Sequence, residues 1–290
     1  MVSFQMVKYH SRNYPQDIPL EIEEIAAHFD VTAINNRKPY SLHTEYSYGK
    51  RNLDSSLLSN FPNIVVSAKE GVPQLWKSEA WALEFAGFLV ALTDGKPAPS
   101  VIEIHPPFSD YSDMDCFTAF YTAFEHTITK VFPNIEILIE NRSGSIYNGG
   151  KFILSKTDDL LKLVNTIESK HLKLKLALDI PQLYTAHNVT NRKTSYYAEF
   201  LAIVREIRDY IGGVHLWGKR KSDSGRNVAH CGDLTSYFEG DESVKQSFLR
   251  AFMNCFDDKT TRKLVLEVNS GDNDLLSIIE DLRSIDVDFQ

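Results

Sequence analysis

Short apolar, β-branched runs alternate with amphipathic stretches along the whole chain, and this alternation limits its fold more than any other feature. Strands that alternate with helices form parallel βαβ units, and near-continuous apolar runs suit a sheet that is covered on both faces. The runs expected to be strands are residues 4–9, 31–35, 64–67, 101–105, 135–140, 172–179, 213–217 and 264–268. The stretches expected to be helices are residues 18–29, 79–92, 116–131, 158–169, 196–210 and 244–256.

Eight such strands in 290 residues predict an α/β fold, a single (β/α)8 TIM barrel that spans residues 1–290 as one domain. No linker rich in Pro, Gly or Ser divides the sequence. An open α/β sheet is the alternative architecture, but no Gly-x-Gly-x-x-Gly follows the first predicted strand to support dinucleotide binding.

Composition narrows the class of protein only slightly. A formal net charge of −8 gives no general basic surface for nonspecific nucleic-acid binding, although one groove can still be positive. The three cysteines are widely spaced, which argues against a disulfide framework or a Cys-type zinc ribbon. The sequence shows no signal peptide and no apolar run of membrane length, so we expect a soluble cytoplasmic protein without membrane contact. The oligomeric state stays open.

Ionisable residues stand at the ends of successive predicted strands: His105, Glu140, Asp179, His215 and Glu267. The carboxyl ends of barrel strands meet at one face, where active sites are built. Three carboxylates and two imidazoles gathered there need a cation among them, so we expect a divalent-metal site. A mixed set of carboxylate and imidazole ligands suits zinc, manganese or iron better than magnesium or calcium.

Each of these residues also has an ordinary structural explanation. A lone Asp or Glu after a strand is commonly a helix cap or an ion-pair partner. Their occurrence on five strands in a row favours the metal site. Five other histidines lie away from predicted strand ends and are interpreted as surface or packing residues: His28, His43, His126, His171 and His187. The role of His10, at the end of the first predicted strand, is left open.

The order Glu, Asp, His, Glu on predicted strands five to eight resembles the metal quartet of the xylose-isomerase-like barrel superfamily. That superfamily includes sugar isomerases, ketose epimerases and the endonuclease IV family, also called AP endonuclease family 2. Several segments look most similar to endonuclease IV: residues 33–37 (AINNR), 139–144 (IENRSG), 178–179 (LD), 214–216 (VHL), 226–230 (RNVAH) and 264–267 (LVLE).

The resemblance implies up to three divalent ions. The central ion would be held by Glu140, Asp179, His215 and Glu267. A second ion would use His105 and share Glu140, and a third would use His230.

Some ligands of the outer two ions are missing from this sequence. The remaining histidine of the second ion is expected after the third strand, where the chain has Ser67. The third ion's histidine and aspartate positions correspond to Gln182 and Val228. We therefore expect one or two ions rather than three, with zinc preferred over manganese or iron.

The resemblance implies a metal-dependent phosphodiesterase that cleaves the DNA backbone at abasic or damaged sites. Glu140 or Glu267 would then orient a water molecule that attacks the phosphorus. The basic residues expected to hold backbone phosphates are Arg37, Lys69, Lys219, Arg220, Lys221 and Arg226. Five aromatic residues are expected either to stack on bases or sugars or to pack within loops: Tyr9, Tyr40, Tyr147, Tyr184 and Trp217.

Two other functions remain open. A sugar isomerase or epimerase needs only one ion, with Glu140 and Glu267 exchanging a proton on a small sugar. The loss of outer ligands at Gln182 and Val228 also suits a degenerate barrel that binds nucleic acid without catalysis. Retention of the whole central quartet argues against this last possibility.

Overall fold

The computed structural model describes residues 2–9, 12–27, 38–44, 57, 59–69, 74–189 and 195–290. The chain divides into two compact units. One, the terminal unit, combines Met1–Glu23 with Ala177–Gln290, and the other, the central unit, is Glu24–Leu176. The boundaries fall inside strands β2 (Ile22–Ala26) and β6 (Leu174–Asp179). We describe each unit by itself, and the expectation of one domain stays a prediction.

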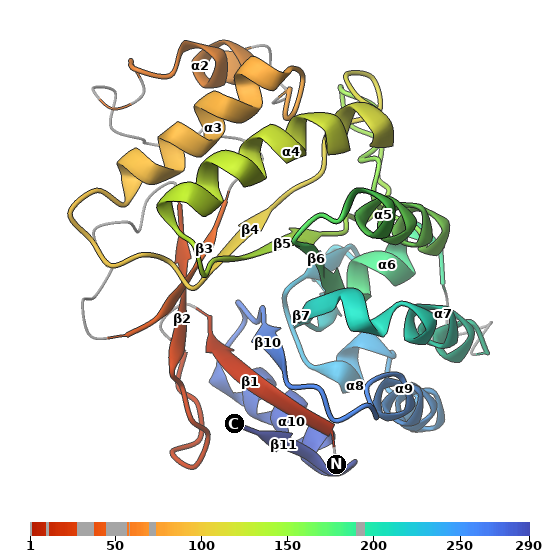
Figure 1. Cartoon of the computed structure of the whole chain (residues 1–290). Helices are drawn as coiled ribbons and strands as arrows, with labels where there is room; N and C mark the ends of the chain where they lie inside the picture. The colour runs from red at the N-terminus through yellow and green to blue at the C-terminus, as the bar shows by residue number, and fades with distance from the viewer. Residues whose placement is uncertain are drawn as a thin grey trace. The chain divides into compact units, whose positions relative to one another are not determined.

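The terminal unit contains strands β1 (Val2–Lys8), β7 (Ile211–Leu216), β10 (Arg262–Leu266) and β11 (Val287–Phe289), and the hairpin β8 (Lys219–Lys221) with β9 (Asn227–Ala229). Its helices are α6 (Ile180–Ala186), α7 (Ser195–Glu206), α8 (Leu234–Tyr237), α9 (Glu242–Cys255) and α10 (Asp272–Arg283), with a 3-10 turn at Arg208–Tyr210. Strand β1 pairs in parallel with β10 and β11, and β10 pairs in parallel with β7. Helices α7 and α9 lie side by side (Figure 1).

The central unit contains strands β3 (Tyr40–His43), β4 (Val101–Ile104) and β5 (Glu136–Glu140) and helices α2 (Pro62–Lys69), α3 (Glu79–Leu92), α4 (Met114–Val131) and α5 (Thr157–Lys170). Strand β4 pairs in parallel with β3 and with β5. Asp113 caps α4 by accepting the Cys116 N–H at 2.8 Å. Helices α3 and α4 lie side by side (Figure 1), and Trp76 packs between Phe85 of α3 and Phe124 of α4.

Hydrogen bonds join the described strands in the order β10-β7-β6-β5-β4-β3-β2-β1-β11, and β10 also pairs with β1. The pairing of the first strand with the eighth long strand of the chain, β10, is the pairing pattern of a (β/α)8 barrel. The predicted fold class is therefore confirmed. Because side chains on strands of this kind are buried on both faces, β4 and β7 are buried along their whole length.

Most predicted strands are confirmed within two residues at each end. The predictions at 4–9, 101–105, 135–140, 172–179, 213–217 and 264–268 correspond to β1, β4, β5, β6, β7 and β10. The prediction at 31–35 lies outside the described residues.

Two predictions near the N-terminus are wrong. Residues 22–26, predicted to belong to a helix at 18–29, form strand β2. Residues 64–67, predicted to be the third strand, belong to helix α2. The place of the third strand is taken by β3, which ends at His43.

Within the described residues, no helix is both long and apolar enough to cross a membrane.

Candidate metal-binding clusters

Among the described residues, each unit contains a group of ligand-type side chains at the carboxyl ends of its strands. The histidine cluster of the central unit consists of His43, His105 and Glu140. The aspartate cluster of the terminal unit consists of Asp179, His215 and Glu267. In each cluster, one donor atom per residue lies within 4.8 Å of the others.

The histidine cluster has the spacing of a metal-ligand set. His105 Nε2 lies 2.9 Å from Glu140 Oε2, and His43 Nε2 lies 3.4 Å from His105 Nε2. His43 Nε2 lies 3.6 Å from Glu140 Oε2. Tetrahedral bonds of ~2.1 Å from zinc to nitrogen or oxygen place ligand atoms about 3.4 Å apart. The two separations that involve His43 Nε2 are close to this value, and the 2.9 Å between His105 Nε2 and Glu140 Oε2 is that of a hydrogen bond.

Neighbouring groups hold the side chains of this cluster in orientation. Glu24 Oε1 lies 3.4 Å from His43 Nδ1, the ring nitrogen on the other side from the cluster. Such a carboxylate fixes the tautomer and ring orientation of a metal-binding histidine. Arg142 donates to Glu140 Oε1 at 2.8 Å, which leaves Oε2 facing the imidazoles. The Trp76 indole donates to the backbone carbonyl of His105 at 2.8 Å.

The two imidazoles of this cluster have opposite pKa shifts. Burial lowers the pKa of His43, but the carboxylates of Glu103 and Glu24 and hydrogen bonding to Glu140 raise it well above its ordinary value. Burial lowers the pKa of His105, and its hydrogen bond to Glu140 does not fully offset this. Despite burial, Arg142 and the two imidazoles hold the pKa of Glu140 well below its usual range. The surrounding carboxylates thus favour the protonated form of His43, whereas burial favours the neutral form of His105.

The aspartate cluster is built from the ends of β6, β7 and β10. Asp179 and His215 are fully buried, and Glu267 is 6% exposed. His215 Nδ1 lies 3.1 Å from Glu267 Oε1. Burial raises the pKa of Glu267, but the imidazoles of His215 and His230 lower it by more, so the carboxylate stays ionised.

His230 reaches this cluster from the end of the β8–β9 hairpin. Its Nδ1 lies 3.1 Å from Glu267 Oε2, so the two oxygens of Glu267 face two different imidazoles. The backbone of His230 has φ of 56°, a left-handed conformation that is unfavourable for a residue with a Cβ. The Asn269 N–H donates to the His230 carbonyl at 2.8 Å and stabilises this conformation.

Three members of the predicted quartet, Asp179, His215 and Glu267, form the aspartate cluster. The fourth, Glu140, is a member of the histidine cluster. His105 lies with Glu140, and His230 lies with Glu267, as the resemblance implied. The metal assignment of all six residues stays a prediction.

The structure also shows where the three residues lie that replace expected ligands of the outer ions. Gln182 is buried beside Asp179, and Val228 is 42% exposed on β9. Ser67 lies in helix α2, so it does not follow the third strand as predicted.

His43 was missed by the sequence interpretation, which assigned it to the surface or to ordinary packing. It ends β3, and its side chain is only 17% exposed. The signal was present in the segment Tyr40-Ser41-Leu42-His43, where Tyr40 and Leu42 alternate with smaller or polar residues. Four residues are too few for alternation to stand out from a loop.

The predicted phosphate-binding residues have varied surroundings. Arg37 lies outside the described residues, and Lys69 ends helix α2. The Lys219 ammonium lies 4.2 Å from the centre of the Tyr237 ring, and burial lowers its pKa. Arg220 donates to Asp274 at 2.8 Å. Arg226 is exposed in the turn between β8 and β9.

No protein-family model matches the sequence, and no curated protein matches it. Among solved structures, the chain is similar to an AP endonuclease, family 2, from Brucella melitensis, at 11% identity and a TM-score of 0.46, covering 95% of this chain and 97% of that one. It is similar to a glycoside hydrolase family 5 enzyme from Prevotella bryantii, at 8% identity and a TM-score of 0.37, covering 97% and 96%. It is also similar to methylaspartate ammonia lyase from Citrobacter amalonaticus, at 12% identity and a TM-score of 0.41, covering 90% and 47%. At these values the likenesses carry no argument about the chemistry of this chain.

Proposed function

We propose that this protein is a divalent-metal-dependent phosphodiesterase that cleaves DNA at abasic or damaged sites. The observation that carries the proposal is the histidine cluster, in which His43 supplies the imidazole that the sequence interpretation found missing. A single-metal sugar enzyme has no need of a second buried ligand set. Hydrolysis of phosphodiesters commonly uses more than one ion.

The residues of both clusters fit divalent ions with mixed nitrogen and oxygen ligands. His43, His105 and Glu140 would hold one ion, and Asp179, His215 and Glu267 would hold another. Zinc suits these sets best, with manganese or iron as alternatives. A bound ion would lower the pKa of water and neutralise charge on the phosphoryl oxygens.

The chain's own groups would orient the reactants. Glu140 is kept ionised by Arg142, and Glu267 is kept ionised by its two imidazoles, so each carboxylate would accept a hydrogen bond from a nearby water and orient it. His230 is 31% exposed beside Glu267 and would exchange protons with solvent.

Phosphate contact is proposed for the β8–β9 hairpin. Arg226 is exposed there, and Arg220 would exchange its contact with Asp274 for a phosphate oxygen. Arg37 and Lys69 are proposed from the resemblance alone.

The test is metal analysis of the purified protein together with incubation on a duplex that carries one abasic site. We expect at least about one zinc ion per chain and cleavage of the backbone at the abasic site. Glu140→Gln and His215→Ala should lower metal content and abolish cleavage while circular dichroism stays unchanged.

Matched controls use the same residue types outside the clusters. Glu136→Gln changes a carboxylate at the start of the same strand, β5, where it pairs with Lys175. His126→Ala changes an exposed histidine of α4. Equal metal content in the cluster variants and in these controls would rule out the assignment.

A sugar isomerase or epimerase is the second candidate, because the aspartate cluster alone would suffice for a one-ion site. Metal binding without DNA cleavage, but with turnover of a keto-sugar, would favour this activity. Metal and DNA binding without any turnover would favour a barrel that recognises nucleic acid without catalysis.

A further inference from the structure

The Asp179 carboxylate is held by two side chains that are not themselves ligand candidates. Trp217 donates its indole N–H to Asp179 Oδ2 at 3.0 Å, and the Gln182 amide donates to the same oxygen at 2.8 Å. The backbone N–H of Gln182 donates to Oδ1 at 2.8 Å, which caps helix α6. Asp179, Gln182 and Trp217 all belong to the terminal unit and are buried.

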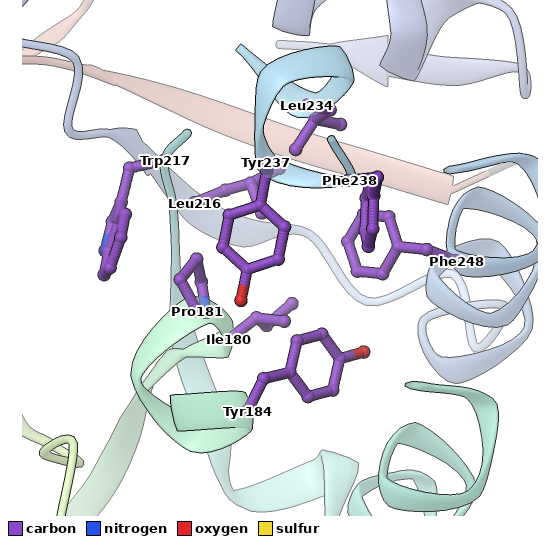
Figure 2. Close-up of a pocket in the computed structure, with 9 residues that line it drawn as sticks. All are labelled: Ile180, Pro181, Tyr184, Leu216, Trp217, Leu234, Tyr237, Phe238 and Phe248. Carbon is purple, nitrogen blue, oxygen red and sulfur yellow. The ribbon is translucent and has the colours of Figure 1, made fainter. Parts of the chain in front are cut away.

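The Trp217 ring is itself fixed in place. It packs against the His230 imidazole, with ring centroids 4.4 Å apart and the rings tilted by 32°. Figure 2 shows the indole at the side of an apolar pocket whose other walls include Pro181 and Tyr237. No gap among the residues that line this pocket is wide enough to hold a water molecule. The direction of the indole N–H is therefore set by packing.

Two donors on one carboxylate oxygen restrict how the carboxylate coordinates an ion. A carboxylate oxygen accepts about two hydrogen bonds through its lone pairs. Oδ2 accepts from two side chains, Trp217 and Gln182, whereas Oδ1 accepts from the Gln182 backbone N–H. Chelation of one ion by both oxygens would therefore be disfavoured, and coordination would fall to Oδ1. Calcium takes 6–8 oxygen ligands and commonly binds carboxylates through both oxygens, whereas zinc takes about four ligands.

We infer that Trp217 and Gln182 are positioning residues that make Asp179 a one-oxygen ligand and thereby select zinc-sized, low-coordination ions over calcium. This inference rests on the proposed metal site at the aspartate cluster. It also gives Gln182 a role in this chain, at a position where the resemblance implies a metal-ligating histidine.

The experiment is Trp217→Phe, which keeps an aromatic ring against Pro181 but removes the N–H. Zinc affinity, measured by competition with a chromophoric chelator, should fall about 10- to 100-fold, as is usual when a group that orients a ligand is lost. The selectivity for zinc over calcium should fall with it. Trp81→Phe is the matched control, since Trp81 is a buried indole of α3 that contacts Trp76 and Phe85.

A cobalt spectrum separates positioning from loss of packing. Cobalt(II) bound with few ligands absorbs visible light more strongly than cobalt(II) with six. In Trp217→Phe, Oδ2 of Asp179 loses one of its donors and becomes available to the ion, so the coordination number should rise. The absorption of the cobalt-saturated variant should therefore weaken, whereas Trp81→Phe should keep the wild-type spectrum. If Trp217→Phe does not fold, Gln182→Leu removes the other donor and should shift the spectrum the same way.

The outcomes are distinct. Zinc binding that is equal in the wild type, Trp81→Phe and Trp217→Phe, with unchanged cobalt spectra, overturns this inference and leaves the proposed metal site in place. Absence of zinc binding in the wild type overturns both.

Discussion

At the residue scale, the histidine cluster places a protonated imidazole where a metal ion would otherwise balance the carboxylates. His43 has a pKa well above its ordinary value because Glu103 and Glu24 outweigh burial. A raised folded pKa stabilises the metal-free protein at low pH, and this contribution is lost as the pH rises through the raised pKa. A metal ion binds only the deprotonated imidazole, so binding must release the proton.

The first prediction concerns this proton. The apparent zinc affinity of the wild type should rise between pH 6 and pH 8, and His43→Ala should release about one proton fewer per chain on zinc binding. Calorimetry in two buffers of different ionisation enthalpy measures the difference. His126→Ala, on the exposed face of α4, should behave as the wild type. Equal proton release from His43→Ala and wild type would contradict the prediction.

Some candidate ligands are conspicuous in the sequence because they lie at the carboxyl end of an apolar run. Glu140 and Glu267 follow runs of apolar residues, where an ionisable side chain is conspicuous. His43 is the last of only four strand residues, Tyr40-Ser41-Leu42-His43, so no pattern sets it apart. Glu24 lies in a strand whose apolar spacing of three, Ile22 and Ile25, suggested a helix.

At the scale of elements, the loops that follow β4 and β5 are joined by backbone hydrogen bonds. The Ser109 N–H donates to the Lys151 carbonyl at 2.7 Å, and the Ile153 N–H donates to the Pro107 carbonyl at 3.1 Å. Phe108 and Phe152 stack beneath them with ring centroids 4.0 Å apart. These contacts fix the chain on either side of the histidine cluster, since the loops begin directly after His105 and Glu140.

The second prediction concerns Gly150, at the turn of the second loop. Its φ is 85°, and a Cβ there would overlap the side chains of Ser109 and Asp110. Gly150→Ala should lower the free energy of unfolding by about 1–3 kcal/mol and weaken zinc binding by the histidine cluster. Gly95→Ala is the control, because its φ is 71° and no atom lies within 4 Å of the added Cβ. Urea unfolding should show a smaller loss for Gly95→Ala than for Gly150→Ala.

Helix α2 shows why the third strand was misplaced. The run Ile64-Val65-Val66 is β-branched and apolar, a composition typical of strands. Pro62 begins the helix, and a proline at the first turn suits a helix start. Asn63, whose backbone N–H donates to Glu84 at 2.7 Å, ties this turn to α3. The conformation of residues 62–69 is therefore decided by contacts with a helix about twenty residues further along the chain. A local sequence pattern carries no information about such contacts.

At the scale of the whole molecule, residues at the amino-terminal ends of the strands serve stability. Arg262 begins β10 and is 2% exposed. It donates to Asp258 and to the backbone carbonyls of Arg208 and Ile211. Loss of the Asp258 carboxylate would leave a buried guanidinium without its counter-charge, which strongly destabilises a fold. In barrels, this end of the strands contributes stability while the opposite end carries function.

The third prediction uses this pair. Hydrogen bonds from Arg262 lower the pKa of Asp258 to about 2, although burial raises it. A depressed carboxyl pKa stabilises the fold above pH ~4, and the stabilisation is lost as the pH falls toward ~2. Asp258→Asn should therefore lower the free energy of unfolding by about 2 kcal/mol at pH 6. The difference from wild type should shrink as the pH approaches 2.

The control for this prediction is Asp257→Asn, because Asp257 is the exposed neighbour that pairs with Arg205 and Arg208. Exposed ion pairs contribute little, so its urea midpoint should stay close to that of the wild type at every pH. A pH-independent loss in Asp258→Asn would show that the effect is not ionic.

The position of His43 also affects how distant relatives of this protein are to be recognised. An alignment anchored on apolar runs sets residues 64–67 against the third strand of a (β/α)8 barrel, and that strand then ends at Ser67. The same alignment anchored on β3 ends the third strand at His43. Chains dismissed as inactive remnants because one ligand appears substituted therefore merit a second inspection of short strands just upstream.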